Sequence, residues 1–148
     1  MKLIVVTEVP VDDILDLRRR VLRADTPSTD PRLPEDGAPS AFHLAARLEG
    51  ELLACLTFSP QDTPLRPGVD AWRFRAMAVD TARQGSGIGR AILTDGIDRA
   101  VARGAATIWA NARDSAIGFY ESMGMHVMGD GFTDASTALA HHVVLLDL

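Results

Sequence analysis

Gln84-Gly85-Ser86-Gly87-Ile88-Gly89 is the stretch of this 148-residue sequence that decides its fold. The stretch follows an apolar, strand-like segment and opens a helix-like one, so its glycines remove side chains where a helix begins. Backbone N–H groups at a helix N-terminus have no partner within the helix, and the helix dipole adds partial positive charge there. The junction therefore predicts a bound phosphate or pyrophosphate. A tight turn with close packing of the helix on the sheet is the alternative interpretation.

Spacing excludes two common phosphate-binding loops. A dinucleotide-binding fingerprint requires a glycine three residues after Gly87, where this sequence has Arg90. A P-loop requires Gly-Lys-Ser or Gly-Lys-Thr, and the sequence contains neither tripeptide. The glycines are flanked by Arg83 and Arg90, which agrees with an anionic ligand.

The segments around the loop predict a single α/β domain over residues 1–148 with a mixed sheet. Runs rich in β-branched and apolar residues predict strands, and apolar residues at helical spacing predict helices. Strands are expected at 2–8, 41–48, 51–58, 70–79, 105–110, 125–131 and 138–147. Helices are expected at 11–23, 87–103 and 114–123, the last with Asp114 as its N-cap. The proline-bearing segments 25–40 and 59–69 are expected to be irregular surface loops.

Two of these segments carry arginines that need an interpretation. In the helix at 11–23, basic residues crowd the C-terminal end, where they complement the helix dipole, so we interpret them as helix stabilisers: Arg18, Arg19, Arg20 and Arg23. In the strand at 70–79, alternation predicts one face with Trp72, Phe74, Ala76 and Ala78 and another with Arg73, Arg75, Met77 and Val79.

Charge and composition narrow the class of partner. The formal net charge of −5 argues against nucleic acid, because phosphate backbones bind basic surfaces. No apolar run approaches the roughly 20 residues of a membrane span, and the apolar N-terminal stretch is too short for a signal peptide, so we expect a soluble, cytoplasmic protein without membrane contact. The single cysteine, Cys55, lies in an apolar run and is interpreted as core rather than nucleophile. No metal is expected.

The glycine loop satisfies the Gln/Arg-x-x-Gly-x-Gly/Ala signature and in this respect resembles the GCN5-related N-acetyltransferases, the GNAT family. Met77-Ala78-Val79 resembles the end of the family's fourth strand, and residues 116–125 resemble its A-x-x-[FL]-Y-x-x-x-G-F segment. Arg113 departs from the pattern, because many members carry Asn there, and Asn111 lies nearby but out of register. The ending with Ala140-His141-His142 is similar to the ElaA/YjcF-like branch.

This resemblance implies the GNAT acyl-CoA N-acyltransferase fold, a mixed and mostly antiparallel sheet flanked by helices. It also implies direct transfer of an acetyl group from acetyl-CoA, the cosubstrate, to the primary amine of a small metabolite or peptide. Carried over to this sequence, the coenzyme A site comprises Met77, Ala78, Val79, Gln84, Gly85, Ser86, Gly87, Ile88, Gly89, Arg90, Asn111, Ala116, Phe119 and Tyr120. A non-catalytic acyl-CoA-binding or sensing domain of the same fold is the alternative, and a nucleotide-binding module is a third reading.

Tyr120 falls on the family's general-acid position, with packing in the core as the alternative. His141 is the preferred general base, and the other histidines or a water chain are the alternatives. Arg73 and Arg75 are interpreted as ligands for a carboxylate on the acceptor, or as partners of aspartates in the segment 25–40.

The sequence does not identify the acceptor. The final strand contains Val143-Val144-Leu145-Leu146, and we expect that it could serve as the sheet edge through which two copies form a homodimer.

Overall fold

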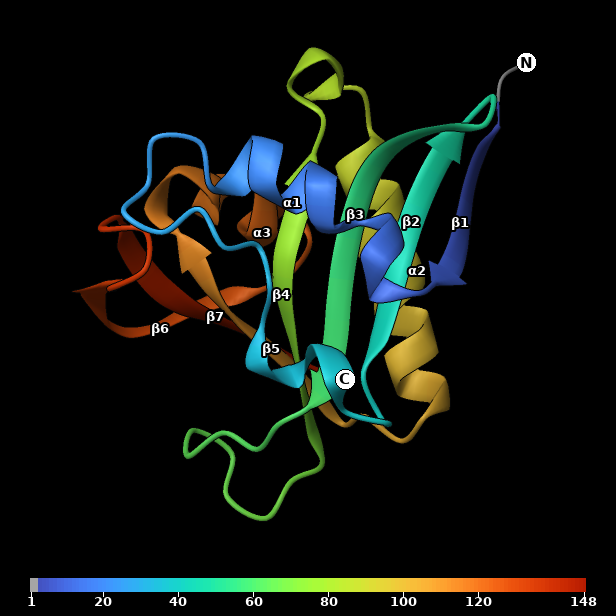
Figure 1. Cartoon of the computed structure of the whole chain (residues 1–148). Helices are drawn as coiled ribbons and strands as arrows, with labels where there is room; N and C mark the ends of the chain where they lie inside the picture. The colour runs from blue at the N-terminus through green and yellow to red at the C-terminus, as the bar shows by residue number, and fades with distance from the viewer. Residues whose placement is uncertain (1–2) are drawn as a thin grey trace.

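A single seven-stranded sheet organises the molecule in the computed structural model, which describes residues 3–148 (Figure 1). The strands are β1 (Ile4–Val9), β2 (Phe42–Leu48), β3 (Glu51–Pro60), β4 (Ala71–Val79), β5 (Thr107–Arg113), β6 (His126–Thr133) and β7 (Ala140–Asp147). Their order across the sheet is β1-β2-β3-β4-β5-β7-β6. Neighbours are antiparallel except for β4 and β5, which are parallel. The predicted mixed, mostly antiparallel sheet is confirmed.

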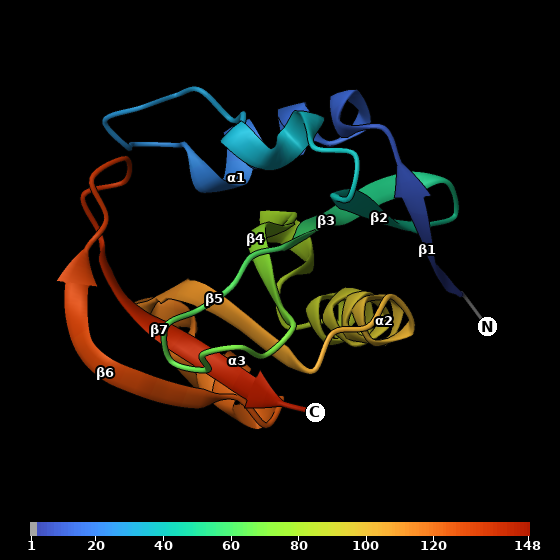
Figure 2. The same cartoon turned by 90° about the horizontal axis from the view of Figure 1, so that it is seen from below.

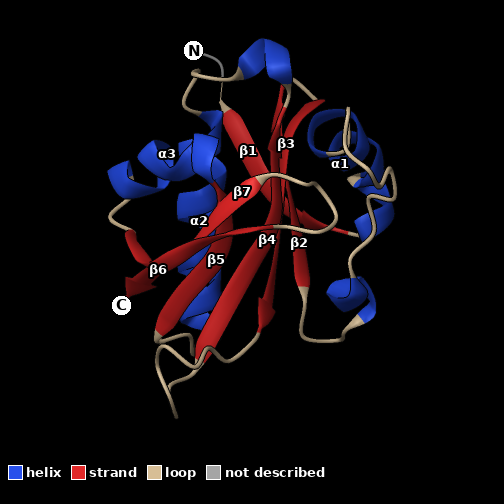
Figure 3. Ribbon diagram, turned by 90° about the vertical axis from the view of Figure 1, so that its left-hand side faces the viewer, coloured by secondary structure: helices blue, strands red, loops and turns tan. Residues whose placement is uncertain are grey.

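Helices cover both faces of the sheet (Figures 2 and 3). The helix α1 (Leu15–Leu22) lies on one face, and α2 (Ile88–Ala102) with α3 (Ile117–Ser122) lies on the other. Short 3-10 turns precede α1, α2 and α3 and also interrupt the proline-rich segment, at Val11–Asp13, Thr81–Arg83, Asp114–Ala116 and Pro34–Gly37. Among the residues described, no helix has both the length and the apolar character needed to cross a membrane.

The larger part of the core lies between α2 and the sheet. At Gly96 the helix lies so close to the sheet that a Cβ atom would come within 2.3 Å of the ring of Phe58. A smaller core under α1 contains Cys55, which is fully buried and confirms the interpretation of this cysteine as core. Burial raises the pKa of the Cys55 thiol to about 12, so the thiol is not a reactive thiolate at neutral pH.

A β-bulge in β4 corrects the predicted faces of this strand. Ala76 has φ of 56°, and the register with β3 shifts so that Ala76 and Met77 lie opposite Leu56 alone. The extra residue reverses the alternation of side chains, as bulges do. Met77 and Val79 therefore pack on the α2 side with Trp72 and Phe74, whereas Ala78 packs under α1.

Three further expectations are wrong in detail. Asp114 does not cap α3, because its Oδ1 accepts a hydrogen bond from His142 Nδ1 at 2.7 Å. Arg18 is not a surface stabiliser of the helix dipole, because it is buried. The final strand β7 is no dimer edge, because it pairs with β5 on one side and β6 on the other.

Candidate active site

The two parallel strands separate in the middle of the sheet, and the candidate site occupies the opening. β4 and β5 pair only from Ala71 to Arg73 with Thr107 to Trp109. Beyond this point residues 74–79 of β4 and 110–113 of β5 have no strand partner across the gap, and a cavity of about 160 Å3 lies there. The bulge at Ala76 falls within this separated part of β4. The opening thus presents unpaired backbone edges to a ligand.

The glycine loop lies at the end of β4, at the N-terminus of α2. Gly85 and Gly87 have φ of 83° and 87°, in the left-handed region that favours glycine. In residues 3–148, the N–H groups of Gly87, Ile88, Gly89 and Arg90 donate to no acceptor of the chain. Four free donors at the N-terminus of a 15-residue helix suit an anion in both geometry and charge.

Packing against β4 holds this helix terminus in place. A Cβ on Gly89 would lie 3.1 Å from the Met77 side chain and 3.5 Å from Val79, so the first turn of α2 rests directly on the strand. The Gln84 side-chain amide donates to the Val79 carbonyl at 3.3 Å. Ile88 and Ala78 point into the cores, so only their backbone groups are available to a ligand.

Tyr120 projects from α3 toward the opening. Its side chain packs against Phe74 and Phe119, and its hydroxyl donates to Met77 Sδ at 3.8 Å. Burial raises the pKa of the phenol to about 12, and the nearby charge of Arg113 opposes this shift. The hydroxyl is consequently protonated throughout the neutral range, as a proton donor must be.

Of the four histidines, His141 alone lines the cavity. Its Nδ1–H donates to the Leu139 carbonyl at 2.9 Å, which leaves the lone pair on Nε2. The ring stacks on Phe132 with centroids 5.8 Å apart. The other three lie elsewhere: His43 is bonded to Thr57, His142 to Asp114, and His126 begins β6 away from the cavity.

The two arginines of β4 differ in their partners. Arg75 Nη1 lies 3.0 Å from Glu35 Oε1, so its charge is paired by the segment 25–40, although by a glutamate rather than by the aspartates expected from sequence. Arg73 stacks over Trp109 at 4.8 Å and donates to Gln61 Oε1 at 3.3 Å, but its Nε is buried without a partner. Burial, and after it the charge of the neighbouring Arg75, lower the pKa of Arg73 to about 10.

Arg23 and Arg113 also line the cavity, although the sequence analysis assigned neither of them a role there. Arg113 donates to the Leu22 carbonyl at 2.7 Å, and Arg23 donates to Ser136 Oγ at 3.1 Å. Burial lowers the pKa of Arg113, with a further contribution from Arg23. The departure of Arg113 from the family pattern was the one available signal.

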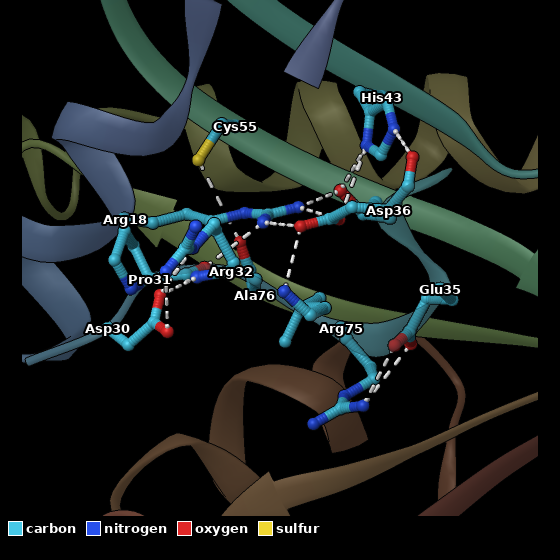
Figure 4. A network of polar contacts seen from close by, with 12 residues as sticks. Arg18, Asp30, Pro31, Arg32, Glu35, Asp36, His43, Cys55, Arg75 and Ala76 are labelled. Carbon is cyan, nitrogen blue, oxygen red and sulfur yellow. Dashed lines mark hydrogen bonds and ion pairs between the residues drawn. The ribbon is translucent and has the colours of Figure 1, made fainter. Parts of the chain in front are cut away.

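A buried polar network holds the segment 25–40 over this face of the sheet (Figure 4). Arg18, which is 1% exposed, donates to both carboxylate oxygens of Asp36 at 2.8 and 3.0 Å and to Thr57 Oγ1 at 2.6 Å. Burial raises the pKa of Asp36, but hydrogen bonds from Arg18 and from Leu33 N–H outweigh it and hold the pKa below its usual value. The network fixes the neighbouring Glu35 where it meets Arg75.

The predicted site residues thus fall into two groups. The cavity brings together Arg73, Arg75, Met77, Asn111, Ala116, Tyr120 and His141. The loop residues Gln84 to Arg90 lie beside it, at the end of β4, and Phe119 contacts both Tyr120 and the edge of Gly89.

A sheet opened between two parallel strands beside a glycine-rich helix N-terminus defines the fold of the acyl-CoA N-acyltransferases. The chain belongs to the acetyltransferase (GNAT) family, whose model matches residues 11–125. As a member of this family, the protein is an acetyltransferase.

Three known proteins illustrate the likeness. The "Uncharacterized N-acetyltransferase YitI" of Bacillus subtilis (strain 168) is 28% identical over 140 residues, which cover 95% of this chain and 93% of that protein. The crystal structure of an aminoglycoside 6'-N-acetyltransferase complexed with coenzyme A is 17% identical, with a TM-score of 0.75 and coverage of 97% and 96%. A GNAT family acetyltransferase from Elizabethkingia anophelis with acetyl-CoA bound is 16% identical, with a TM-score of 0.70 and coverage of 98% of each chain.

Proposed function

We propose that the protein transfers an acetyl group from acetyl-CoA directly to a primary amine, with Tyr120 as general acid and His141 as general base. The observation that carries the proposal is the row of free N–H groups from Gly87 to Arg90 beside the opened strands. This arrangement offers a pyrophosphate site and, next to it, a slot with an unpaired strand edge. The similar fold of proteins crystallised with coenzyme A and acetyl-CoA supports this choice of donor.

In this proposal the donor lies along β4. The pyrophosphate binds the N–H groups of the glycine loop, with Arg83 and Arg90 adding positive charge and Gln84, Gly85 and Ser86 shaping the turn. The pantetheine arm occupies the opening and pairs with the free backbone of Met77, Ala78 and Val79. Asn111, Ala116 and Phe119 form the other side, toward the end of β5 and the start of α3.

The transfer needs one bond made, one bond broken and two protons moved. The amine nitrogen attacks the thioester carbon, whose carbonyl is polarised by backbone N–H groups of β4, and the carbon–sulfur bond then breaks. The amine proton passes to His141 Nε2, directly or through water, and the departing thiolate takes its proton from the Tyr120 hydroxyl. The role of His141 agrees with the resemblance of its segment to the ElaA/YjcF-like branch.

Thiol release from acetyl-CoA across a panel of primary amines tests the proposal. We expect turnover with at least one amine, and a fall in kcat of about 100- to 10,000-fold in Tyr120→Phe, as for the loss of a general acid. A full rate in Tyr120→Phe with chemistry rate-limiting would remove Tyr120 from the mechanism. Tight binding of acetyl-CoA without turnover on any amine would favour a sensing domain instead.

The donor site is tested separately with a truncated donor. Arg83→Ala and Arg90→Ala are expected to raise the KM for acetyl-CoA but not for S-acetylpantetheine, which lacks the pyrophosphate. Arg19→Ala is the matched control, because Arg19 is an exposed arginine paired with Asp16, outside the site. Equal effects on both donors would contradict pyrophosphate binding at the loop.

A further inference from the structure

Three arginines that line the cavity have no carboxylate partner. Arg23, Arg73 and Arg113 donate only to neutral oxygens, namely those of Ser136, Gln61 and Leu22. Within the described part of the chain, none of the three forms an ion pair. The other two arginines of the cavity are neutralised, Arg18 by Asp36 and Arg75 by Glu35. Unpaired charge is therefore a property of this set and not of every arginine in the cavity.

Keeping these charges unpaired costs stability. Arg73 is partly buried, its Nε has no partner, and it lies close enough to Arg75 for the two charges to repel. Arg113 is half-buried and in the same way is repelled by Arg23. A desolvated cation without a counter-charge destabilises a folded chain, and a bound anion removes the cost.

The carboxylates that act on these arginines from a distance, namely Asp30, Glu35 and Asp134, do not balance their charge. Asp134 Oδ2 accepts hydrogen bonds from the backbone and hydroxyl groups of Ser136 and Thr137, at 2.7 to 3.1 Å. These bonds fix it within its own turn between β6 and β7. Its charge acts on both Arg73 and Arg113. Of the other two acids, Glu35 is paired with Arg75 and Asp30 with Arg32, so three cations remain with little opposing charge.

The unpaired arginines lie where an acceptor would have to enter. The charge of Arg113 is felt by the Tyr120 hydroxyl, which places it beside the proposed reacting centre. His141 pairs in register with Arg113, so the proposed base and this cation project from the same face of the sheet. The pyrophosphate site is at the end of β4 instead, at the start of α2.

We infer that the acceptor is an anionic amine, which carries a carboxylate or phosphate group close to its amine, and that Arg23, Arg73 and Arg113 hold this group. The inference rests on the proposed acetyl transfer and names the class of acceptor for it. It differs from the expectation based on sequence, in which Arg75 also binds the acceptor's carboxylate, because Glu35 neutralises Arg75. The arginines assigned here form no ion pair within the described residues. A cavity of about 160 Å3 fits a small acceptor of this class.

Matched pairs of acceptors test the inference on the intact protein. Each pair keeps the amine and removes the anion: 4-aminobutyrate against butylamine, glycine against glycinamide, and phosphoethanolamine against ethanolamine. We expect kcat/KM to favour one anionic member by about 10- to 100-fold, mainly through KM, as for hydrogen bonds to a charged group. Comparison of the carboxylate pairs with the phosphate pair shows which anion the site prefers.

Arginine variants then locate the site. In Arg73→Gln and Arg113→Gln, the ratio of kcat/KM for the anionic acceptor to kcat/KM for its neutral counterpart is expected to fall toward one. Arg66 is paired with Asp147 outside the cavity, so Arg66→Gln is the control and is expected to keep the wild-type ratio. Because each variant removes an unpaired cation, its melting temperature without ligand is expected to equal or exceed that of the wild type. A purely structural role of either arginine would instead lower it.

Three outcomes would overturn the inference. Equal or better turnover of the neutral amines rejects the anionic acceptor while acetyl transfer itself stands. A defect of Arg113→Gln that appears with acetyl-CoA but not with S-acetylpantetheine assigns the arginine to the donor's phosphates. Absence of turnover with every amine, together with absence of acetyl-CoA binding, rejects the proposed function and the inference with it. If a variant fails to fold, the acceptor pairs measured on the wild-type protein still decide whether the acceptor is anionic.

Discussion

Tyr120 is the side chain on which the proposed chemistry depends most directly. Because its pKa is raised to about 12, the phenol stays protonated up to at least about pH 10. We therefore predict that kcat does not fall between pH 7 and 10, so long as chemistry is rate-limiting. A pH profile of single-turnover thiol release measures this, and a descending limb below pH 10 that disappears in Tyr120→Phe would contradict it.

Arg18 and Asp36 form the ion pair that binds the segment 25–40 to the sheet. Removing the guanidinium in Arg18→Met leaves the buried Asp36 without its counter-charge and Thr57 without one of its hydrogen bonds, so we predict a loss of about 3–5 kcal/mol in the free energy of unfolding. Arg19→Met, on the exposed face of the same helix, is the control and is expected to change nothing measurable. Chemical denaturation measures both, and an equal response of the two variants would contradict the prediction.

The same pair makes stability depend on pH in a defined direction. Asp36 has a lowered pKa in the folded state, so it contributes stability above its unfolded pKa of about 4, and this contribution is lost as the pH falls through the folded value. The acid-induced loss of stability below about pH 4 is therefore expected to be shallower in Asp36→Asn. Denaturation midpoints of both proteins between pH 3 and 7 measure the difference, and parallel curves would contradict it.

Among the elements, α2 depends on one close approach to the sheet. At Gly96 an added Cβ would meet the buried ring of Phe58 and the side chain of Leu44 at 2.3 to 3.1 Å. Gly96→Ala is therefore predicted to lower the free energy of unfolding by about 1–3 kcal/mol, as overpacking does. Gly118→Ala in α3, where a Cβ would have open space, is the matched control and is expected to be neutral or stabilising. Equal effects of the two changes would contradict this account.

The bulge in β4 is the element that makes the site possible. It reverses the alternation of the strand in the stretch that has lost its pairing to β5. Met77 consequently points toward Tyr120 rather than toward Arg73, with which sequence alternation would group it. A period of two predicts faces only while a strand stays regular, and the sequence carries no marker of this bulge, because Ala76 is not a glycine.

For the molecule as a whole, the donor should act as a stabilising ligand. Acetyl-CoA at about 100 times its Kd is predicted to add about 2.7 kcal/mol of stability, which raises the melting temperature by several degrees. ATP is predicted to give no comparable shift, because it shares the adenosine and the pyrophosphate of acetyl-CoA but has no pantetheine arm to occupy the opening between β4 and β5. A larger shift with ATP than with acetyl-CoA would favour a nucleotide-binding module.

Local sequence determined the strand and helix order, the core position of Cys55, and the glycine-rich start of α2 at Gln84 to Gly89. These depend on periodicity and on backbone freedom, which short segments carry by themselves. Tertiary structure alone decided that β4 and β5 separate after three paired residues, that β7 is interior, and that Arg18 is buried. It also decided which arginines lack a partner: Arg75 meets Glu35 from 40 positions away, whereas Arg73 does not. The reason is that charge pairing depends on distances between segments remote in sequence, and no local pattern contains those distances.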